Sequence, residues 1–285
     1  MSEKKTIRGA EFLIAETDAN DIFIPEEWNE EQKMIAQMCN DFLAAEVHPH
    51  LEAIDKAEDT NLMPSIMDKA GQLGLLGMSV PEELGGMGMD FKTSMLATEA
   101  LGAGYSFSVA YGAHTGIGTL PLLYYGTEEQ KAKYIPKLAT GEWKASYCLT
   151  EPSSGSDANS GRTTATLSAD GTYYELTGQK MWITNAGFAN LHTVFARIGD
   201  DENLTAFLVE ADLKGITLNP EEKKMGIKGS STRQVFYNNV KVPAENMLSD
   251  RGNGFKIAVN ILNIGRAKLG GGVMGGCKAA ITDSV

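Results

Sequence analysis

A short apolar run followed by a serine- and glycine-rich loop has the residue types best suited to binding a cofactor. Tyr147–Thr150 is apolar and β-prone, and the run breaks at Glu151 and Pro152. The loop that follows, 153–156, reads Ser-Ser-Gly-Ser and presents backbone amides beside hydroxyl groups. Such a loop can bind a pyrophosphate or the polar edge of a heterocycle. An ordinary strand and turn has a similar composition, so the loop alone leaves both interpretations open.

A second segment, Met181–Asn185, adds an aromatic ring and a hydroxyl group. Trp182 supplies a flat apolar area, and Thr184 follows two residues later. Read alone, Trp182 also fits a core position in a strand. Its place beside Thr184 and downstream of the Ser/Gly loop favours contact with a planar cofactor.

Both segments closely resemble the two signature stretches of the acyl-CoA dehydrogenase family, flavoproteins that desaturate fatty acyl thioesters between Cα and Cβ. The resemblance covers roughly residues 25 to 285. Further stretches similar to that family, in its usual order, are Pro81–Gly88, Tyr134–Glu142, Gly178–Lys180, Lys224–Thr232 and Val240–Pro243. The details most similar to its very-long-chain branch are Gly112–His114, Glu222–Gly226 and Asn260–Asn263.

The resemblance implies FAD as cofactor and acyl-CoA as substrate. It implies that one wall of the flavin site is formed by the first segment, with Thr150 near the ring, and the other by the second segment. The residues implied to bind the cofactor are Tyr147, Cys148, Leu149, Thr150, Gly155, Ser156, Trp182, Ile183 and Thr184. Those implied to bind the substrate are Ser156, Asn263 and Arg266.

The family's reaction also needs a base for the α-proton and donors that polarise the thioester carbonyl. One branch carries its catalytic glutamate at the position of Gly265, and glycine has no proton acceptor. Most members carry the glutamate in a C-terminal domain, which the resemblance implies is largely missing here. The nearest rivals are Glu99, which fits a solvated helix face, and Glu151, which fits a cap on backbone amides. We therefore assign no catalytic residue and expect the chain to be inactive alone.

Three blocks are expected to position these residues, in an α+β fold. Residues 1–143 are expected to form an all-helical domain, 144–250 a β-barrel or sandwich domain, and 251–285 the truncated start of a C-terminal helical bundle. Capping patterns predict helices after Asn29, after Asp90 and after Thr127, and Pro64 suits the first turn of another. The first of these helices is expected to end near Pro49.

Strand-like composition begins at Lys144. Runs rich in Thr, Val, Phe and Tyr predict strands, and Asp170-Gly171 predicts a hairpin turn between two of them. The runs are Lys144–Thr150, Arg162–Leu167, Tyr173–Thr177, Thr193–Ile198, Leu204–Glu210 and Gln234–Val242. The glycines of 85–88 and 270–272 favour a turn and close helix packing, because neither group lies in the βαβ setting of a phosphate loop.

Composition narrows the class of protein. The formal net charge of −12 over 285 residues argues against nucleic acid and against electrostatic binding to anionic membranes. Three widely spaced cysteines indicate neither a disulfide framework nor a metal site, and the pair His48 and His50 lacks further ligands. The polar start Met1–Lys5 does not read as a leader, and no stretch is long enough to span a membrane. We therefore expect a cytoplasmic protein.

Three functions remain open on the sequence. The first is an acyl-CoA dehydrogenase that passes electrons to an electron-transfer flavoprotein and assembles, when full length, as a homodimer or homotetramer. The second is an acyl-CoA oxidase or flavin monooxygenase of the same fold. The third is a non-catalytic module that binds FAD or acyl-CoA.

Overall fold

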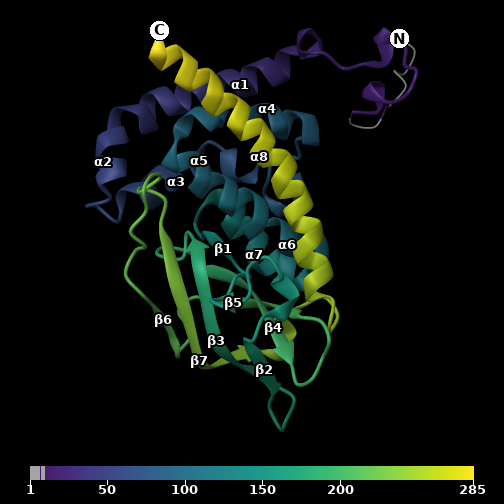
Figure 1. Ribbon diagram of the computed structural model, residues 1–285, viewed down its shortest axis with the longest axis vertical. Coiled ribbons are helices and arrows are strands. Elements are labelled where there is room, and N and C mark those ends of the chain that lie inside the picture. The colour runs from purple at the N-terminus through teal and green to yellow at the C-terminus, as the bar shows by residue number, and fades with distance from the viewer. Residues whose placement is uncertain (1–6, 8–9) are drawn as a thin grey trace.

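The computed structural model describes residue 7 and residues 10–285, apart from the side chain of Pro25. Figure 1 shows a helical part above a twisted sheet, with the long helix α8 (Gly254–Ser284) running from the sheet across the helices. The predicted order of helical, β and helical parts, and the α+β class, are confirmed. The polar start Met1–Lys5 lies outside the described residues.

The helical part packs around a buried cluster that includes Phe42, Met67 and Phe107. The predicted capping boxes of Asn29 with Gln32 and Thr127 with Gln130 are both present, and Asp90 caps its helix by accepting from Thr93. The helices are α1 (Glu30–Phe42), α2 (Leu51–Lys56), α3 (Leu62–Gln72), α4 (Phe91–Leu101), α5 (Ser106–Gly112), α6 (Leu120–Tyr125) and α7 (Glu128–Thr140).

One helix boundary differs from the prediction, that of the first helix, whereas Pro64 lies in a first turn as predicted. Helix α1 ends at Phe42, but the chain stays helical through a wide π turn, Leu43–Val47, and a tight 3-10 turn, His48–His50. Pro49 sits in the first turn of that last segment, where its missing N–H has no intrahelical partner to lose. Helix α3 begins at Leu62, so Pro64 lies inside its first turn.

The middle part is one mixed sheet in the order β6-β7-β3-β2-β4-β5-β8, with β1 paired to β4. The hairpin predicted at Asp170-Gly171 is confirmed, because β2 and β3 pair antiparallel. Strands β4 and β5 also pair antiparallel. Strands β1 and β4 are parallel, so the end of β1 lies beside β4. The strands are β1 (Ala145–Cys148), β2 (Thr164–Leu167), β3 (Tyr173–Thr184), β4 (Leu191–Ile198), β5 (Thr205–Glu210), β6 (Ile216–Leu218), β7 (Thr232–Pro243) and β8 (Met247–Leu248).

A buried histidine joins the helices to the sheet. The N–H of Ala145, at the start of β1, donates to Nδ1 of His114 (3.0 Å), and Nε2 lies 2.9 Å from the carbonyl of Leu138 in α7. These partners require the neutral tautomer that carries its hydrogen on Nε2. Burial lowers the pKa of His114 to about 4, so the junction suits a neutral ring.

Helix α8 approaches α4 backbone to backbone. A Cβ on Gly275 would lie 1.8 Å from the carbonyl oxygen of Glu99, and one on Gly102 would lie 2.1 Å from that of Gly272. Side chains at these positions are therefore excluded. The close helix packing predicted for 270–272 is confirmed at Gly272. The turn predicted for 85–88 is confirmed as well, since Gly85 and Gly88 have positive φ.

Candidate functional site

A cavity of about 510 Å³ opens where β1, the loop after it, β3 and helix α8 meet. It brings together all the residues predicted to bind a cofactor except Cys148. Six further lining residues were not predicted as site residues from the sequence: Ile117, Asp157, Ala158, Phe255, Val259 and Leu262. Its lining residues are Ile117, Tyr147, Leu149, Thr150, Gly155, Ser156, Asp157, Ala158, Trp182, Ile183, Thr184, Phe255, Val259, Leu262 and Arg266.

Strand β1 divides its side chains between the cavity and the core. Tyr147 and Leu149 line the cavity, whereas the fully buried Cys148 belongs to the core cluster within the sheet. This follows from the alternation of side chains along a strand. The cofactor role predicted for Cys148 would therefore rest on its backbone.

The hydroxyl of Tyr147 is a polar atom that needs a partner. It is buried, and within the described part of the chain it has no hydrogen-bond partner. Its ring packs edge-on against Phe195, with centroids 4.9 Å apart. Burial raises the pKa of Tyr147, so the group remains a neutral donor. An unsatisfied buried hydroxyl beside a cavity fits a ligand that accepts a hydrogen bond.

A β-bulge presents Trp182 to the cavity. The register of β3 against β7 shifts between Lys180 and Ile183, and Trp182 has φ 56°. A left-handed backbone is costly for a bulky residue, and such strain gathers at functional sites. The indole is 60% exposed, whereas Ile183 is 2% exposed. The bulge thus displays a large flat apolar surface that the core could otherwise have buried.

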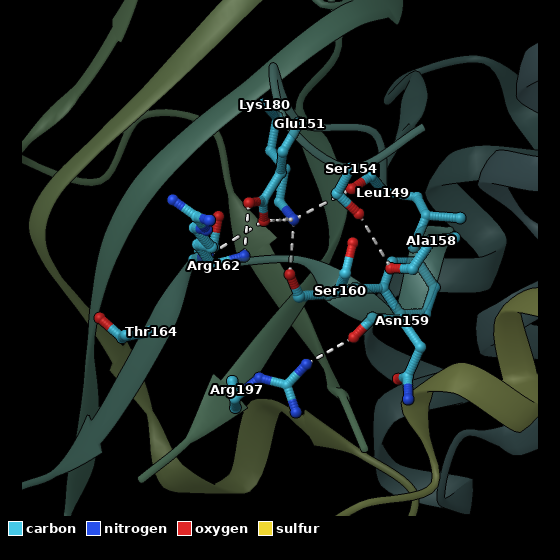
Figure 2. A network of polar contacts seen from close by, with 12 residues as sticks. Leu149, Glu151, Ser154, Ala158, Asn159, Ser160, Arg162, Thr164, Lys180 and Arg197 are labelled. Atoms are coloured by element: carbon cyan, nitrogen blue, oxygen red, sulfur yellow. Dashed lines mark hydrogen bonds and ion pairs between the residues drawn. The ribbon is translucent and has the colours of Figure 1, made fainter. Parts of the chain in front are cut away.

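A buried ion pair links the two predicted segments, as Figure 2 shows. Lys180 Nζ lies 2.7 Å from Glu151 Oε1, with both side chains almost fully buried. The same ammonium donates to the carbonyl oxygens of Leu149 (3.1 Å) and Phe195 (2.7 Å). Lys180 therefore fixes the strand that bears Trp182 to the end of the segment that bears Thr150.

Glu151 is held as a charged structural group. Its carboxylate also accepts from the backbone N–H groups of Arg162 and Thr163, the latter at 3.0 Å, which confirms the expected capping of backbone amides. Burial acts to raise the pKa of Glu151, but the Lys180 ammonium and these donors outweigh it and hold the pKa below its usual value. A carboxylate with these partners is unsuited to accepting a substrate proton.

The Ser/Gly loop is closed on itself and open toward the cavity. Ser154 is buried and its hydroxyl donates to the carbonyl of Asp157 (2.8 Å), while Gly155 and Ser156 stay exposed. Arg197 donates to the carbonyl of Asn159 at the far end of the loop, as Figure 2 shows. The loop is thereby anchored at both ends and leaves the predicted phosphate-side residues free.

A second cavity, of about 560 Å³, adjoins the first. The residues that line both cavities are Ile117, Thr184, Leu262 and Arg266. The second cavity runs between α8 and the helices α4 and α5, with mostly small or apolar lining residues such as Gly116 and Val273. In the described chain no Asp or Glu lines it, and Gly265 does.

The two residues predicted to bind the substrate from α8 have different places. Arg266 lines both cavities, whereas Asn263 lines neither. The side-chain oxygen of Asn263 accepts from Arg266 Nη1 at 2.5 Å. The structure therefore places Asn263 as a support that orients the Arg266 guanidinium toward the cavities.

Other kinds of site find no support in the described residues. No cluster of three or more His, Cys, Asp and Glu could hold a metal ion there. Within the same range, none of the helices combines the length and apolar character that crossing a membrane requires. His192 is buried and bonds Tyr237 (3.0 Å), in keeping with a hydrogen-bonded structural histidine.

Two family models match most of the chain. "Acyl-CoA dehydrogenase, N-terminal domain" matches residues 29–142, and "Acyl-CoA dehydrogenase, middle domain" matches residues 146–240. The chain belongs to the acyl-CoA dehydrogenase family. The resemblance inferred from the sequence motifs is therefore confirmed.

Individual family members agree. A probable acyl-CoA dehydrogenase from Bacillus subtilis (strain 168) is 48% identical over 274 residues, covering 96% of this chain and 46% of that protein. The human very long-chain specific acyl-CoA dehydrogenase, mitochondrial, is 46% identical over 223 residues, covering 75% of this chain and 34% of that protein. The predicted similarity to the very-long-chain branch is thus confirmed.

The fold matches a solved member of the family. The crystal structure of an acyl-CoA dehydrogenase complexed with FAD from Bacillus anthracis superposes with a TM-score of 0.91 at 49% identity, covering 95% of this chain and 46% of that chain. The present chain thus spans less than half the length of these relatives.

Proposed function

We propose that this chain is the FAD- and acyl-binding part of an acyl-CoA dehydrogenase. The observation that carries the proposal is the adjacency of the two cavities. One has the Trp182 ring, hydroxyls and exposed loop residues, the other is mostly apolar, and Thr184 borders both. A planar redox cofactor in the first would lie against an acyl chain in the second.

The residues of the first cavity fit FAD. The exposed face of Trp182 and the buried hydroxyl of Tyr147 suit a flat ring with polar edges. Gly155 and Ser156 offer amides and a hydroxyl to phosphates. When bound, FAD supplies the acceptor for the β-hydride of an acyl thioester.

The residues of this chain are suited to orienting and enclosing the cofactor and the substrate. They do not supply a base for the α-proton. Arg266, held by Asn263, is suited to a phosphate or an adenine face of CoA. The rival base Glu151 is committed to Lys180, and Glu99 forms an ion pair with Lys278. With no carboxylate on the second cavity in the described chain, we infer that this chain alone binds FAD and acyl-CoA without desaturating the substrate. Removal of a general base costs about two to four orders of magnitude in rate.

Several finer features stay predictions. They are electron-transfer flavoprotein as electron acceptor, a homodimer or homotetramer, a cytoplasmic location, and domain boundaries at 143 and 250. Reoxidation rates measured with dioxygen and with a flavoprotein acceptor, on a full-length relative, separate a dehydrogenase from an oxidase.

FAD binding tests the proposal. We expect the chain to bind FAD non-covalently, with a perturbed flavin absorption spectrum, and Trp182→Ala to weaken binding by about tenfold through loss of ring contact. Trp28→Ala is the matched control, because Trp28 packs against Phe23 and lines neither cavity. Equal FAD retention by both variants, with an unchanged spectrum, would show that Trp182 does not face the flavin.

A further inference from the structure

One cation on helix α8 lines the second cavity without a partner. Lys268 is partly buried, and among the residues that the structure describes its ammonium has neither a hydrogen bond nor an ion pair. Burial lowers its pKa to about 8. A desolvated cation is costly unless something compensates its charge.

The position of Lys268 on the helix explains why it reaches the cavity. It lies three residues after Gly265 and four before Gly272, so the three share one face of α8. Gly272 touches the backbone at Gly102, and Gly265 lines the cavity. The side chain of Lys268 is long and lies between two glycines on a tightly packed helix face. The cavity is therefore the space into which it extends.

Acids on α4 and at the end of α8 are already engaged. The carboxylate of Glu99, on the facing helix α4, pairs with Lys278. That of Asp283, further along α8, accepts from the hydroxyl of Tyr105 at 2.8 Å. Neither group lies on the cavity lining, so the chain as described supplies no counter-ion for Lys268.

The threonine and serine hydroxyl groups on the helical side of this wall, between Thr98 and Thr115, are also engaged. Thr98 donates to the carbonyl of Ser94 (2.8 Å), and Thr115 donates to that of Tyr111 (2.9 Å). Ser108 donates to the carbonyl of Leu101 in the same way. What the cavity presents to a ligand is therefore a mostly apolar wall with the Thr184 hydroxyl at the border of the first cavity and two cations, Lys268 and Arg266.

We propose that Lys268 recognises a carboxylate carried by an aliphatic chain in this cavity. The ligand chemistry is an apolar chain with an anionic group, either a free fatty acid anion or an acyl thioester with a second carboxylate. The inference rests on the proposed function only in treating this cavity as the acyl site. It makes Lys268 a specificity-determining residue for an acidic acyl group.

Calorimetric titration of the 285-residue chain, without FAD, tests this with decanoate and decanol as probes. We expect Lys268→Met to weaken decanoate binding about tenfold or more and to leave decanol binding unchanged or tighter, because one charge-assisted hydrogen bond is lost. Lys268→Arg keeps the charge and should retain most of the affinity. Lys256→Met is the matched control, an exposed lysine on the same helix outside both cavities.

A second arm separates the two sources of the carboxylate. Decanoyl-pantetheine is compared with the mono-pantetheine thioester of decanedioic acid. If the group recognised is a second carboxylate, Lys268→Met weakens the decanedioic thioester about tenfold and spares the decanoyl thioester. If the group recognised is the carboxylate of a free fatty acid, Lys268→Met weakens the binding of decanoate and leaves the binding of both thioesters unchanged.

The proposal is overturned if Lys268→Met leaves decanoate and both thioesters unaffected, or if it weakens decanol as much as decanoate. Lys268→Gln provides a second neutral variant should the methionine variant not fold. FAD binding is measured on the same samples. Loss of the Lys268 effect with FAD binding intact refutes this inference alone, whereas absence of FAD binding with the Lys268 effect intact refutes the proposed function.

Discussion

Two lysines, one buried within the sheet and one on the α8 wall of the second cavity, have opposite surroundings. Lys180, on the sheet side, is completely buried and directs its ammonium to one carboxylate and two carbonyl oxygens. Lys268, on the α8 side, is partly buried in a cavity wall and has no partner among the described residues. A buried cation whose ammonium is fully hydrogen-bonded has a structural role. A cation that lines a cavity without a partner is available to a ligand.

The walls themselves differ in the same way. The sheet wall is fixed by a network that leaves its charges satisfied, so its bulge can hold Trp182 in a strained conformation. The α8 wall is fixed by backbone contacts at glycines, which leave space beside them.

Breaking the buried pair should have the largest effect on stability. Lys180→Met leaves the Glu151 carboxylate buried without its cation, which typically costs about 3–5 kcal/mol. Urea denaturation followed by circular dichroism measures this. Lys33→Met removes an exposed ion pair with Glu30 and should cost less than about 1 kcal/mol. Similar midpoints for the two variants would contradict the role given to Lys180.

Acid should destabilise the fold at two buried histidines, His114 at the junction between helices and sheet and His192 within the sheet. His114 and His192 are buried, and burial lowers the pKa of each from 6.5 to about 4. Between these values the unfolded chain binds more protons than the folded chain, so stability falls as pH falls from 6.5 to 4. Each ring can contribute up to about 3 kcal/mol.

The pH dependence of urea denaturation checks this. His192→Gln removes one titrating ring, so its stability curve should be flatter than that of the wild type over the same interval. If the stability of the variant and of the wild type changed equally with pH, the pKa of His192 would be the same in the folded and unfolded chains. Glu151, whose pKa is also lowered, adds a loss only at more acid pH, as its carboxylate becomes protonated.

Glycine substitutions test the α8 wall with smaller effects. Gly275→Ala places a methyl group against the Glu99 carbonyl and should destabilise by about 1–3 kcal/mol. Gly270→Ala meets nothing within 4 Å and should be neutral or stabilise by up to about 1 kcal/mol through helix propensity. Thermal unfolding distinguishes the two, and equal shifts would argue against close packing of α8 on α4.

The sequence predicted the elements that have strong local signals. Capping boxes at Asn29 and Thr127 marked helix starts correctly, and Asp170-Gly171 marked a hairpin. Helices α5 and α6 were missed because their glycines and aromatic residues give no cap and little periodicity. Strands β6 and β8 were missed because they have three and two residues and exist only through pairing.

The sequence predicted those cavity residues that lie in recognisable motifs. It missed residues that only tertiary packing brings to the cavity. Eight of the nine residues predicted to bind a cofactor line the first cavity, but Cys148 does not, because strand alternation turns its side chain inward. Ile117 and Phe255 had no sequence signal, since only the fold brings them to the cavity. Lys268 looked like an ordinary helix lysine, because its lack of a partner is visible only in three dimensions.

The adjacency of the two cavities at Thr184 is the central claim, and a difference spectrum tests it directly. The chain is saturated with FAD and titrated with decanoyl-CoA, while calorimetry reports binding of the thioester independently. We predict that binding perturbs the flavin absorption bands without bleaching them, because the acyl chain reaches the ring but no base removes its α-proton. Binding of decanoyl-CoA that leaves the flavin spectrum unchanged would contradict the account.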